Sequence, residues 1–155
     1  MKCDRITERV FVGPDLREAA DFRQLQELGV TAVLSLQTED DLRNRAIDWE
    51  GRSAAGFGMA YRNLPVTDFD LADLALRLPS CVDTLEELLR EGHTVYVHCT
   101  AGVIRSPTVV AAYLHRCEGW QLEAAVAHLE KTRHCNPNQL AIRLAFGVKD
   151  RSDGS

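Results

Sequence analysis

The sequence lacks several features that would place it in a specialised class of protein. No apolar run approaches the roughly 18 residues that a membrane span needs, and no CxxC pair suggests a zinc cluster. The five cysteines are an odd number, which argues against a disulfide framework. With 18 Lys and Arg against 23 Asp and Glu, the chain has no cationic excess for a nucleic acid or an anionic membrane.

The first residues also lack the basic and then apolar layout of a secretory signal, so we expect a cytoplasmic, reducing location. A chain of 155 residues is the size of one ordinary domain with a single core. We place this domain at residues 1–148 and expect the polar stretch 149–155, KDRSDGS, to be a disordered tail. The sequence gives no indication of an oligomeric state.

Strand and helix patterns alternate along the chain. Strand or extended patterns occur at 8–13, 30–37, 59–70 and 93–99. Helical patterns occur at 15–29, 38–50, 74–90, 106–118, 121–132 and 138–148. The glycines of 51–58 predict a loop there. This order predicts an α/β fold with a central, mostly parallel sheet covered by helices on both faces, and a ligand site at the carboxyl ends of the strands.

The stretch VYVHCTAGVIRSP, residues 95–107, joins an apolar strand to a cysteine, a small-residue loop and an arginine. A thiolate is stabilised where backbone N–H groups and a helix N-terminus converge near an arginine, which is the setting expected for Cys99. The loop amides would form an anion-binding nest, in which Gly102 allows a turn that side chains would obstruct. Arg105 adds a planar fork that can hold two phosphoryl oxygens. The predicted ligand is therefore a phosphate group, bound by Arg105 and by the loop residues Thr100, Ala101, Gly102, Val103 and Ile104.

The residues on either side of this loop fit the same chemistry. Ser106 could donate its hydroxyl to the sulfur when the thiolate departs. Pro107 suits the first turn of a helix, where its missing N–H has no helical partner. We expect His98 to order the loop by a hydrogen bond to the backbone, and we do not assign it as the catalytic base.

HCTAGVIRS matches the HCxxGxxRS signature, and the chain therefore resembles the cysteine-dependent dual-specificity phosphatases. The resemblance implies their fold and an attack of Cys99 on phosphorus that forms a cysteinyl-phosphate. It also implies an upstream aspartate that first protonates the leaving oxygen and then activates water, and it implies no metal or other cofactor. By the family layout this acid is Asp68, although Asp70 and Asp73 lie in the same loop and could instead cap the next helix.

The best local similarity is to the laforin-like and plant starch-excess glucan phosphatases, at DFD, RLP, VHCTAG and RHCNPNQLAIRLA. It implies a phosphorylated glucan of starch or glycogen type as substrate, with Phe69 beside the acid as a sugar-stacking face. Two positions depart from these relatives. Ile104 stands where they have a second glycine, and Asn136 stands where a plant relative carries a stacking aromatic.

Other functions stay open at this point. A phosphoprotein phosphatase for Tyr, Ser or Thr is favoured if Ile104 narrows the cleft. A phosphoinositide or RNA-triphosphate substrate is disfavoured because the loop contains no lysine. A catalytically inactive glycan- or phosphopeptide-binding module is disfavoured by the intact Cys99, Arg105 and Asp68.

Two side questions concern the remaining cysteines and Trp120. Cys81, Cys117 or Cys135 could capture an oxidised Cys99 in a reversible disulfide, but a buried structural role is the simpler expectation for each. Trp120 could stack on a sugar, but we expect it to be a core residue or a hydrophobic staple at a helix start.

Overall fold

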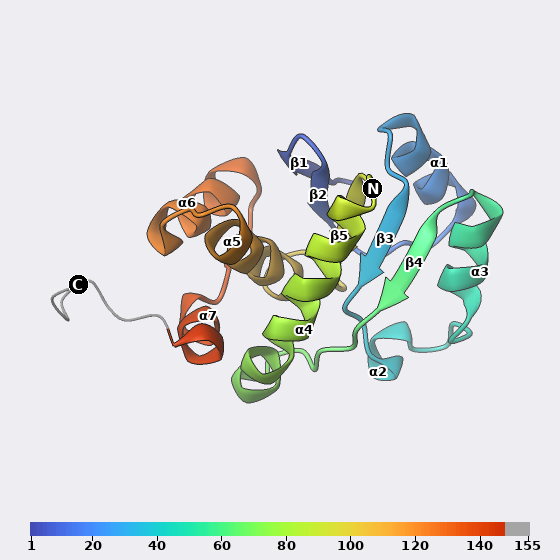
Figure 1. The fold of residues 1–155 in the computed structure, drawn as a ribbon. Helices are drawn as coiled ribbons and strands as arrows, with labels where there is room; N and C mark the ends of the chain where they lie inside the picture. The colour runs from blue at the N-terminus through green and yellow to red at the C-terminus, as the bar shows by residue number, and fades with distance from the viewer. Residues whose placement is uncertain (148–155) are drawn as a thin grey trace, which may run out of the picture.

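The computed structural model describes residues 1–147, which form a five-stranded sheet between two layers of helices (Figure 1). The strands are β1 (Asp4–Thr7), β2 (Val10–Gly13), β3 (Ala32–Ser35), β4 (Ala60–Asn63) and β5 (Val95–His98). Their order is β1-β2-β5-β3-β4, with β1 antiparallel to β2 and the other neighbours parallel. The predicted α/β fold with a mostly parallel sheet is confirmed.

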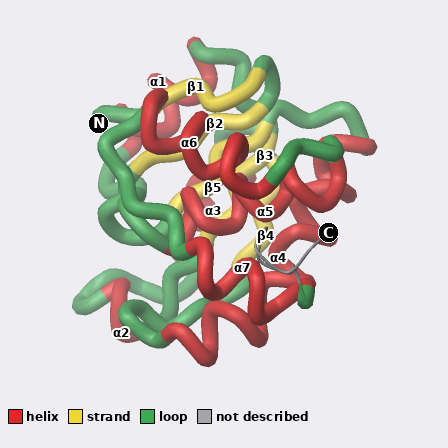
Figure 2. The backbone as a smooth tube through the Cα atoms, turned by 90° about the vertical axis from the view of Figure 1, so that its left-hand side faces the viewer, coloured by secondary structure: helices red, strands yellow, loops and turns green. Residues whose placement is uncertain are grey.

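Successive residues of the central strands belong to two separate hydrophobic cores, because a strand points alternate side chains to opposite faces. Helices cover both faces of the sheet (Figures 1 and 2). Val95 and Val97 of β5 pack with the layer of four C-terminal helices, whereas Tyr96 packs on the other face. The first layer contains α4 (Leu71–Arg90), α5 (Arg105–Cys117), α6 (Leu122–Thr132) and α7 (Gln139–Phe146). The second contains α1 (Ala19–Glu27) and α3 (Trp49–Gly56).

The structure of residues 38–58 differs from the prediction of a helix over 38–50 followed by a loop over 51–58. A single turn, α2 (Glu39–Leu42), starts at a Thr38 capping box and ends at Arg43, whose φ is 56°. The next helix, α3, runs through the predicted loop. A Cβ on Gly51 would lie 3.2 Å from the ring of Tyr61 in β4. This glycine therefore serves close packing of helix on strand rather than a turn.

The two ends of the chain also differ from the pattern analysis. The edge strand β1 was not predicted, because only Ile6 of its four residues is buried and such a strand has little hydrophobic signal. The predicted disordered tail at 149–155, together with residue 148 of the predicted domain, lies outside the described residues.

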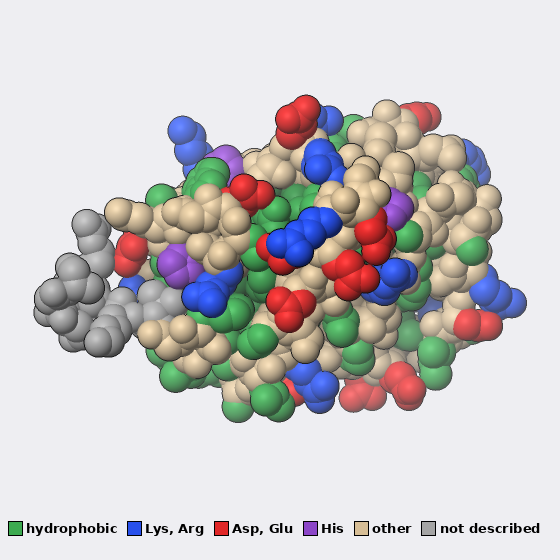
Figure 3. Space-filling model, viewed as in Figure 1, with side chains coloured by type: hydrophobic (Ala, Val, Ile, Leu, Met, Phe, Trp, Pro, Cys, Tyr) green, Lys and Arg blue, Asp and Glu red, His purple; other side chains and the backbone are tan. Residues whose placement is uncertain are grey.

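Charged side chains of both signs are interspersed on the face shown in Figure 3. Such a surface offers no continuous basic patch on that face, in line with the net charge of −5. Within residues 1–147, no helix combines the length and the apolar character needed to cross a bilayer.

The parallel register brings three strand ends to one edge of the sheet. Gly13 of β2 and Ser35 of β3 both pair with His98, the last residue of β5. The segments that follow these strands therefore start side by side. This edge is where a doubly covered sheet binds its ligands.

Candidate active site

Cys99 follows the central strand β5 and is only 3% exposed. Its Sγ lies 3.3 Å from the hydroxyl of Ser106 in the first turn of α5. The N-terminal end of that helix is thus beside the sulfur. A helix N-terminus and a hydroxyl donor both favour negative charge on a thiol.

The loop between Cys99 and Arg105 rests directly on the end of β2. Gly102 has a φ of 69°, and a Cβ there would lie 2.6 Å from the carbonyl carbon and oxygen of Gly13. The loop is also tied on both sides, because Thr100 O accepts from Asp15 N at 2.9 Å and Val103 O accepts from Asn136 N at 2.7 Å. Only glycine fits the turn that sequence analysis assigned to position 102.

Arg105 is 2% exposed, and its guanidinium is held in the site by Asp41 of α2. Its Nη1 donates to Asp41 Oδ2 at 2.8 Å and to the Val66 carbonyl at 2.8 Å, and its Nη2 donates to Asp41 Oδ1 at 3.1 Å. Its buried Nε has no hydrogen-bond partner among the described residues. This Nε lies 3.3 Å from Asp68 Oδ1 in an ion pair without a hydrogen bond, so it can still donate to a phosphoryl oxygen.

Sequence analysis missed Asp41, whose TEDD context indicated only a helix start. Burial raises its pKa, but hydrogen bonds from Arg105 and Thr38 and the positive charge of Arg105 lower the pKa further, to about 2. The hydroxyl of Thr100 also donates to Asp41 Oδ1 at 3.0 Å and accepts from Gln37 Nε2 at 3.1 Å. Asp41 therefore stays ionised and fixes both the arginine and the start of the loop.

Replacing Asp41 by asparagine is expected to lower kcat/KM for p-nitrophenyl phosphate about 10- to 100-fold, since a hydrogen bond to a charged group contributes about 1.5–3 kcal/mol. The contribution of Asp41 to stability is present above its unfolded pKa of 3.8 and is lost as pH falls toward 2. Urea unfolding between pH 2 and 5 should therefore show a weaker pH dependence in the variant. The neighbouring, exposed Asp40→Asn is the control and should match the wild type; equal activity of the two variants would contradict the assignment.

His98 forms a second buried pair, with Glu50 of α3. Its Nε2 lies 2.7 Å from Glu50 Oε2, and its Nδ1 lies 2.9 Å from the Cys99 carbonyl oxygen. Burial lowers the pKa of His98, but the charge and hydrogen bond of Glu50 raise it more, so the net shift is upward. The pair therefore stabilises the fold below the ordinary histidine pKa, and this contribution is lost as pH rises through the higher folded value. His98 contacts the backbone of the loop, as expected, and Glu50 is a partner that sequence analysis missed.

The acidic loop before α4 separates its three aspartates by role. Asp70 caps the helix by accepting from Asp73 N at 2.9 Å, and Asp73 accepts from Thr67 N at 2.8 Å and from Arg77 Nε at 3.2 Å. Asp68 is 35% exposed and places Oδ1 3.3 Å from Arg105 Nε. Of the three, Asp68 alone is shown facing the arginine, which places it at the site; its role as the acid stays a prediction.

A hollow of about 220 Å³ extends from Arg105 along this loop. Ile104 and Phe69 both line it, and Phe69 is 89% exposed with a φ of 56°. Asn136 is an exposed residue that contacts the loop through its backbone, whereas Asn138 lines the hollow. The structure therefore groups Phe69 and Ile104 with the site and leaves the side chain of Asn136 outside this hollow.

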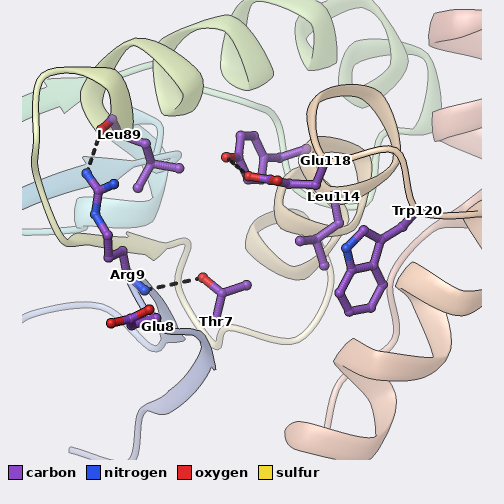
Figure 4. Close-up of a pocket in the computed structure, with 8 residues that line it drawn as sticks. Thr7, Glu8, Arg9, Leu89, Leu114, Glu118 and Trp120 are labelled. Carbon is purple, nitrogen blue, oxygen red and sulfur yellow. Dashed lines mark hydrogen bonds between the residues drawn. The ribbon is translucent and has the colours of Figure 1, made fainter.

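Trp120 lies in a different hollow, of about 270 Å³, at the opposite end of β2 (Figure 4). It is 36% exposed and therefore not a core residue, but it directly precedes Gln121, the N-cap of α6, and its ring packs on His128 of that helix with centroids 5.1 Å apart. The neighbouring Arg9 directly precedes β2, whereas Cys99 lies beyond the far end of the parallel strands. Trp120 is therefore remote from the candidate active site.

The other candidate redox cysteines are protonated thiols. Burial raises the pKa of Cys81 to about 12 and that of Cys135 to about 11. Burial and the neighbouring Glu86 raise the pKa of Cys117 to about 12. All are free cysteines in the structure. This favours the structural role expected for them.

A cysteine at a strand end, a loop leading into a helix, and a buried arginine that faces an aspartate define the cysteine-dependent phosphatase class. Residues 11–144 match the family model of the dual specificity phosphatase catalytic domain, and the chain belongs to that family. This identification confirms the resemblance noted in HCTAGVIRS.

Several curated relatives are similar over most of this chain. Phosphoglucan phosphatase LSF1 of Arabidopsis thaliana is 35% identical over 147 residues, which are 94% of this chain and 25% of the relative. Phosphoglucan phosphatase DSP4 of Castanea sativa is 34% identical over 142 residues, 88% and 37% of the two chains. Laforin of Mus musculus is 35% identical over 135 residues, which are 79% of this chain and 41% of the relative. The chain thus spans less than half the length of each of these relatives.

Solved structures share the fold. PTPMT1 in complex with PI(5)P aligns with a TM-score of 0.74 and 25% identity over 92% of this chain and 91% of that chain. Tk-PTP in the active form aligns with a TM-score of 0.75 and 22% identity over 94% of this chain and 97% of that chain. The second similarity, at 22% identity, shows the fold alone.

Proposed function

We propose that this protein removes phosphate monoesters from a phosphorylated glucan of starch or glycogen type. The observation that carries the proposal is the ring of Phe69, which is 89% exposed on the hollow that leads to Arg105. Because the ring lies at the hollow that leads to Arg105, it offers a flat apolar face on which a sugar bound at the phosphate site can stack. Two of the relatives above are named phosphoglucan phosphatases, which supports the same substrate class.

In this proposal the reaction occurs in two steps at Cys99. The thiolate attacks phosphorus, the bond to the leaving oxygen breaks, and Asp68 gives its proton to that oxygen. Water then attacks the cysteinyl-phosphate, Asp68 accepts a proton from the water, and the S–P bond breaks to release phosphate and the thiolate. Ser106, 3.3 Å from the sulfur, donates a hydrogen bond to it as it departs.

The binding of the phosphoryl group falls to Arg105 and the loop amides, which can hold its non-bridging oxygens through both steps. The sugar would lie in the hollow beyond them. Polar residues there can bond to hydroxyl groups, and Phe69 can cover one face of a ring. The polar lining residues besides Arg105 are Thr67, Asp70 and Asn138.

We expect Phe69→Ala to lower kcat/KM on phosphorylated amylopectin about 3- to 10-fold, in line with the roughly 0.5–1.5 kcal/mol of an aromatic contact. Turnover of p-nitrophenyl phosphate should be unchanged. Trp120→Ala, which removes an aromatic ring outside the site, is the matched control and should leave both rates unaltered.

Ile104→Gly should keep or raise glucan turnover, because it opens the rim of the loop.

The second candidate is a phosphoprotein phosphatase. Dual specificity protein phosphatase 26 of Mus musculus is 29% identical over 151 residues, 96% of this chain, and the apolar Ile104 in the hollow would suit a peptide side chain. Phosphotyrosyl and phosphoseryl peptides therefore belong in the same assay. If the wild type hydrolyses peptides readily at concentrations where it does not act on phosphoglucan, the glucan proposal fails and this one replaces it.

A further inference from the structure

Arg133, at the C-terminal end of α6, places its guanidinium against the outside of the loop that follows Cys99. Its side chain is 9% exposed, and each of its three nitrogens donates a hydrogen bond. Nε donates to the Gly102 carbonyl at 2.8 Å and Nη2 to the Ala101 carbonyl at 3.1 Å. Nη1 donates to the Lys2 carbonyl and to Asp4 Oδ2, both at 2.9 Å.

These two contacts complete a set in which every carbonyl of the loop is held by a neighbour. The Cys99 carbonyl contacts His98, Thr100 O is held by Asp15, Val103 O by Asn136, and Ile104 O by Thr108. The two carbonyls between them, at positions 101 and 102, are the ones bonded to Arg133. Arg133 is therefore the side chain that fixes the middle of the loop.

The direction of a carbonyl decides the direction of the next amide. Residues 1–147 contain no cis peptide bond, and in a trans peptide the N–H points opposite to the preceding C=O. With the carbonyls of Ala101 and Gly102 turned outward to Arg133, the amides of Gly102 and Val103 turn toward the interior of the loop. Gly102 has no side chain to restrict rotation, so these two peptide planes are the ones most able to flip without an external partner.

We propose that Arg133 is a positioning residue that preorganises the phosphate-binding loop, although its guanidinium faces away from the phosphate. The proposal rests on the phosphatase function above and extends it to a residue outside the signature motif. The contacts to Lys2 and to Asp4 of β1 anchor the same guanidinium from the other side, where β1 and α6 are in contact. The loop is thereby fixed against the N-terminal strand.

The test compares Arg133→Met with Arg143→Met. Arg143 of α7 pairs with Glu123 at 3.2 Å and has a side chain that is 22% exposed, so its replacement removes an ion pair on the helical layer but no contact to the loop. Vanadate inhibition and kcat with p-nitrophenyl phosphate are measured for both variants, well below their midpoints of thermal unfolding. Removing one oxyanion donor costs roughly 10²–10³ in rate. Because the amides of Arg133→Met remain in the chain and only lose their fixed direction, we expect about 10- to 100-fold weaker vanadate binding and a similar fall in kcat.

A variant that keeps the charge separates positioning from charge. Arg133→Lys retains the positive charge beside Asp4. A lysine lacks the planar fork of arginine, so it cannot bond to both loop carbonyls and to the carboxylate at once, and we expect an intermediate vanadate affinity. Added guanidinium should raise the activity of Arg133→Ala and not that of Arg143→Ala. Wild-type vanadate affinity and kcat in Arg133→Met would overturn the proposal, as would full activity in Arg133→Lys. Absence of turnover in the wild type would instead refute the phosphatase function.

Discussion

Replacing Cys99 by serine is expected to reduce phosphatase turnover by roughly 10⁴-fold or more, the scale of losing a covalent nucleophile. A serine hydroxyl in the same position cannot ionise near neutral pH, so no phosphoryl intermediate forms. The loop and Arg105 are untouched, and vanadate or phosphate should still bind. The measurements are turnover of p-nitrophenyl phosphate and the shift in thermal midpoint caused by phosphate.

Cys117→Ser is the matched control for this variant. Cys117 is a half-buried thiol at the end of α5, where burial raises its pKa, and it takes no part in the proposed chemistry. The control should retain wild-type turnover. Appreciable turnover in Cys99→Ser would exclude Cys99 as the nucleophile.

Replacing Asp68 by alanine is expected to slow hydrolysis of sugar and serine phosphates by about 10²–10⁴-fold, the usual contribution of a general acid. Aryl phosphates should lose far less, because their leaving oxygens need little protonation. The measurement is kcat/KM for a series of substrates whose leaving groups differ in pKa. We expect kcat/KM to depend more steeply on leaving-group pKa in Asp68→Ala than in the wild type. The steeper slope is a signature that a merely destabilised loop would not produce.

Asp70→Ala is the comparison within the same loop. It removes the cap of α4 and should reduce thermal stability, since loss of an N-cap costs about 0.5–2 kcal/mol. The dependence on the leaving group should stay as in the wild type. If the steeper slope appears in Asp70→Ala and not in Asp68→Ala, the acid has been placed on the wrong residue.

The sequence could predict the part of the site that lies within one short segment, residues 99–105. Cys99, Gly102 and Arg105 share a strand, a loop and a helix start, so their spacing alone places them around one centre. Asp41 and Glu50 could not be found this way. Asp41 meets Arg105 across 64 positions and Glu50 meets His98 across 48, and only the packing of α2 and α3 brings them together.

Local signals failed in the fold for a related reason. The glycines at 51 and 56 lie within a helix that packs on β4, so tertiary contact outweighed their low helix propensity. The pattern of the three central strands was more reliable, because β2, β3 and β5 are fully buried and their runs are mostly apolar. Predicting partners of a buried arginine or histidine requires knowing which helices cover which sheet face.

Because Arg133 and Asn136 anchor the loop, the phosphate site can be completed only late in the synthesis and folding of the domain. Cys99 is synthesised after Asp15 but before Asn136 and Arg133, which hold the carbonyls of Ala101, Gly102 and Val103. The segment around Cys99 therefore leaves the ribosome without the contacts that fix these three carbonyls. The loop reaches its final form only when the last third of the domain folds back onto the first strand, so a nascent chain contains the thiol before it contains a complete phosphate site.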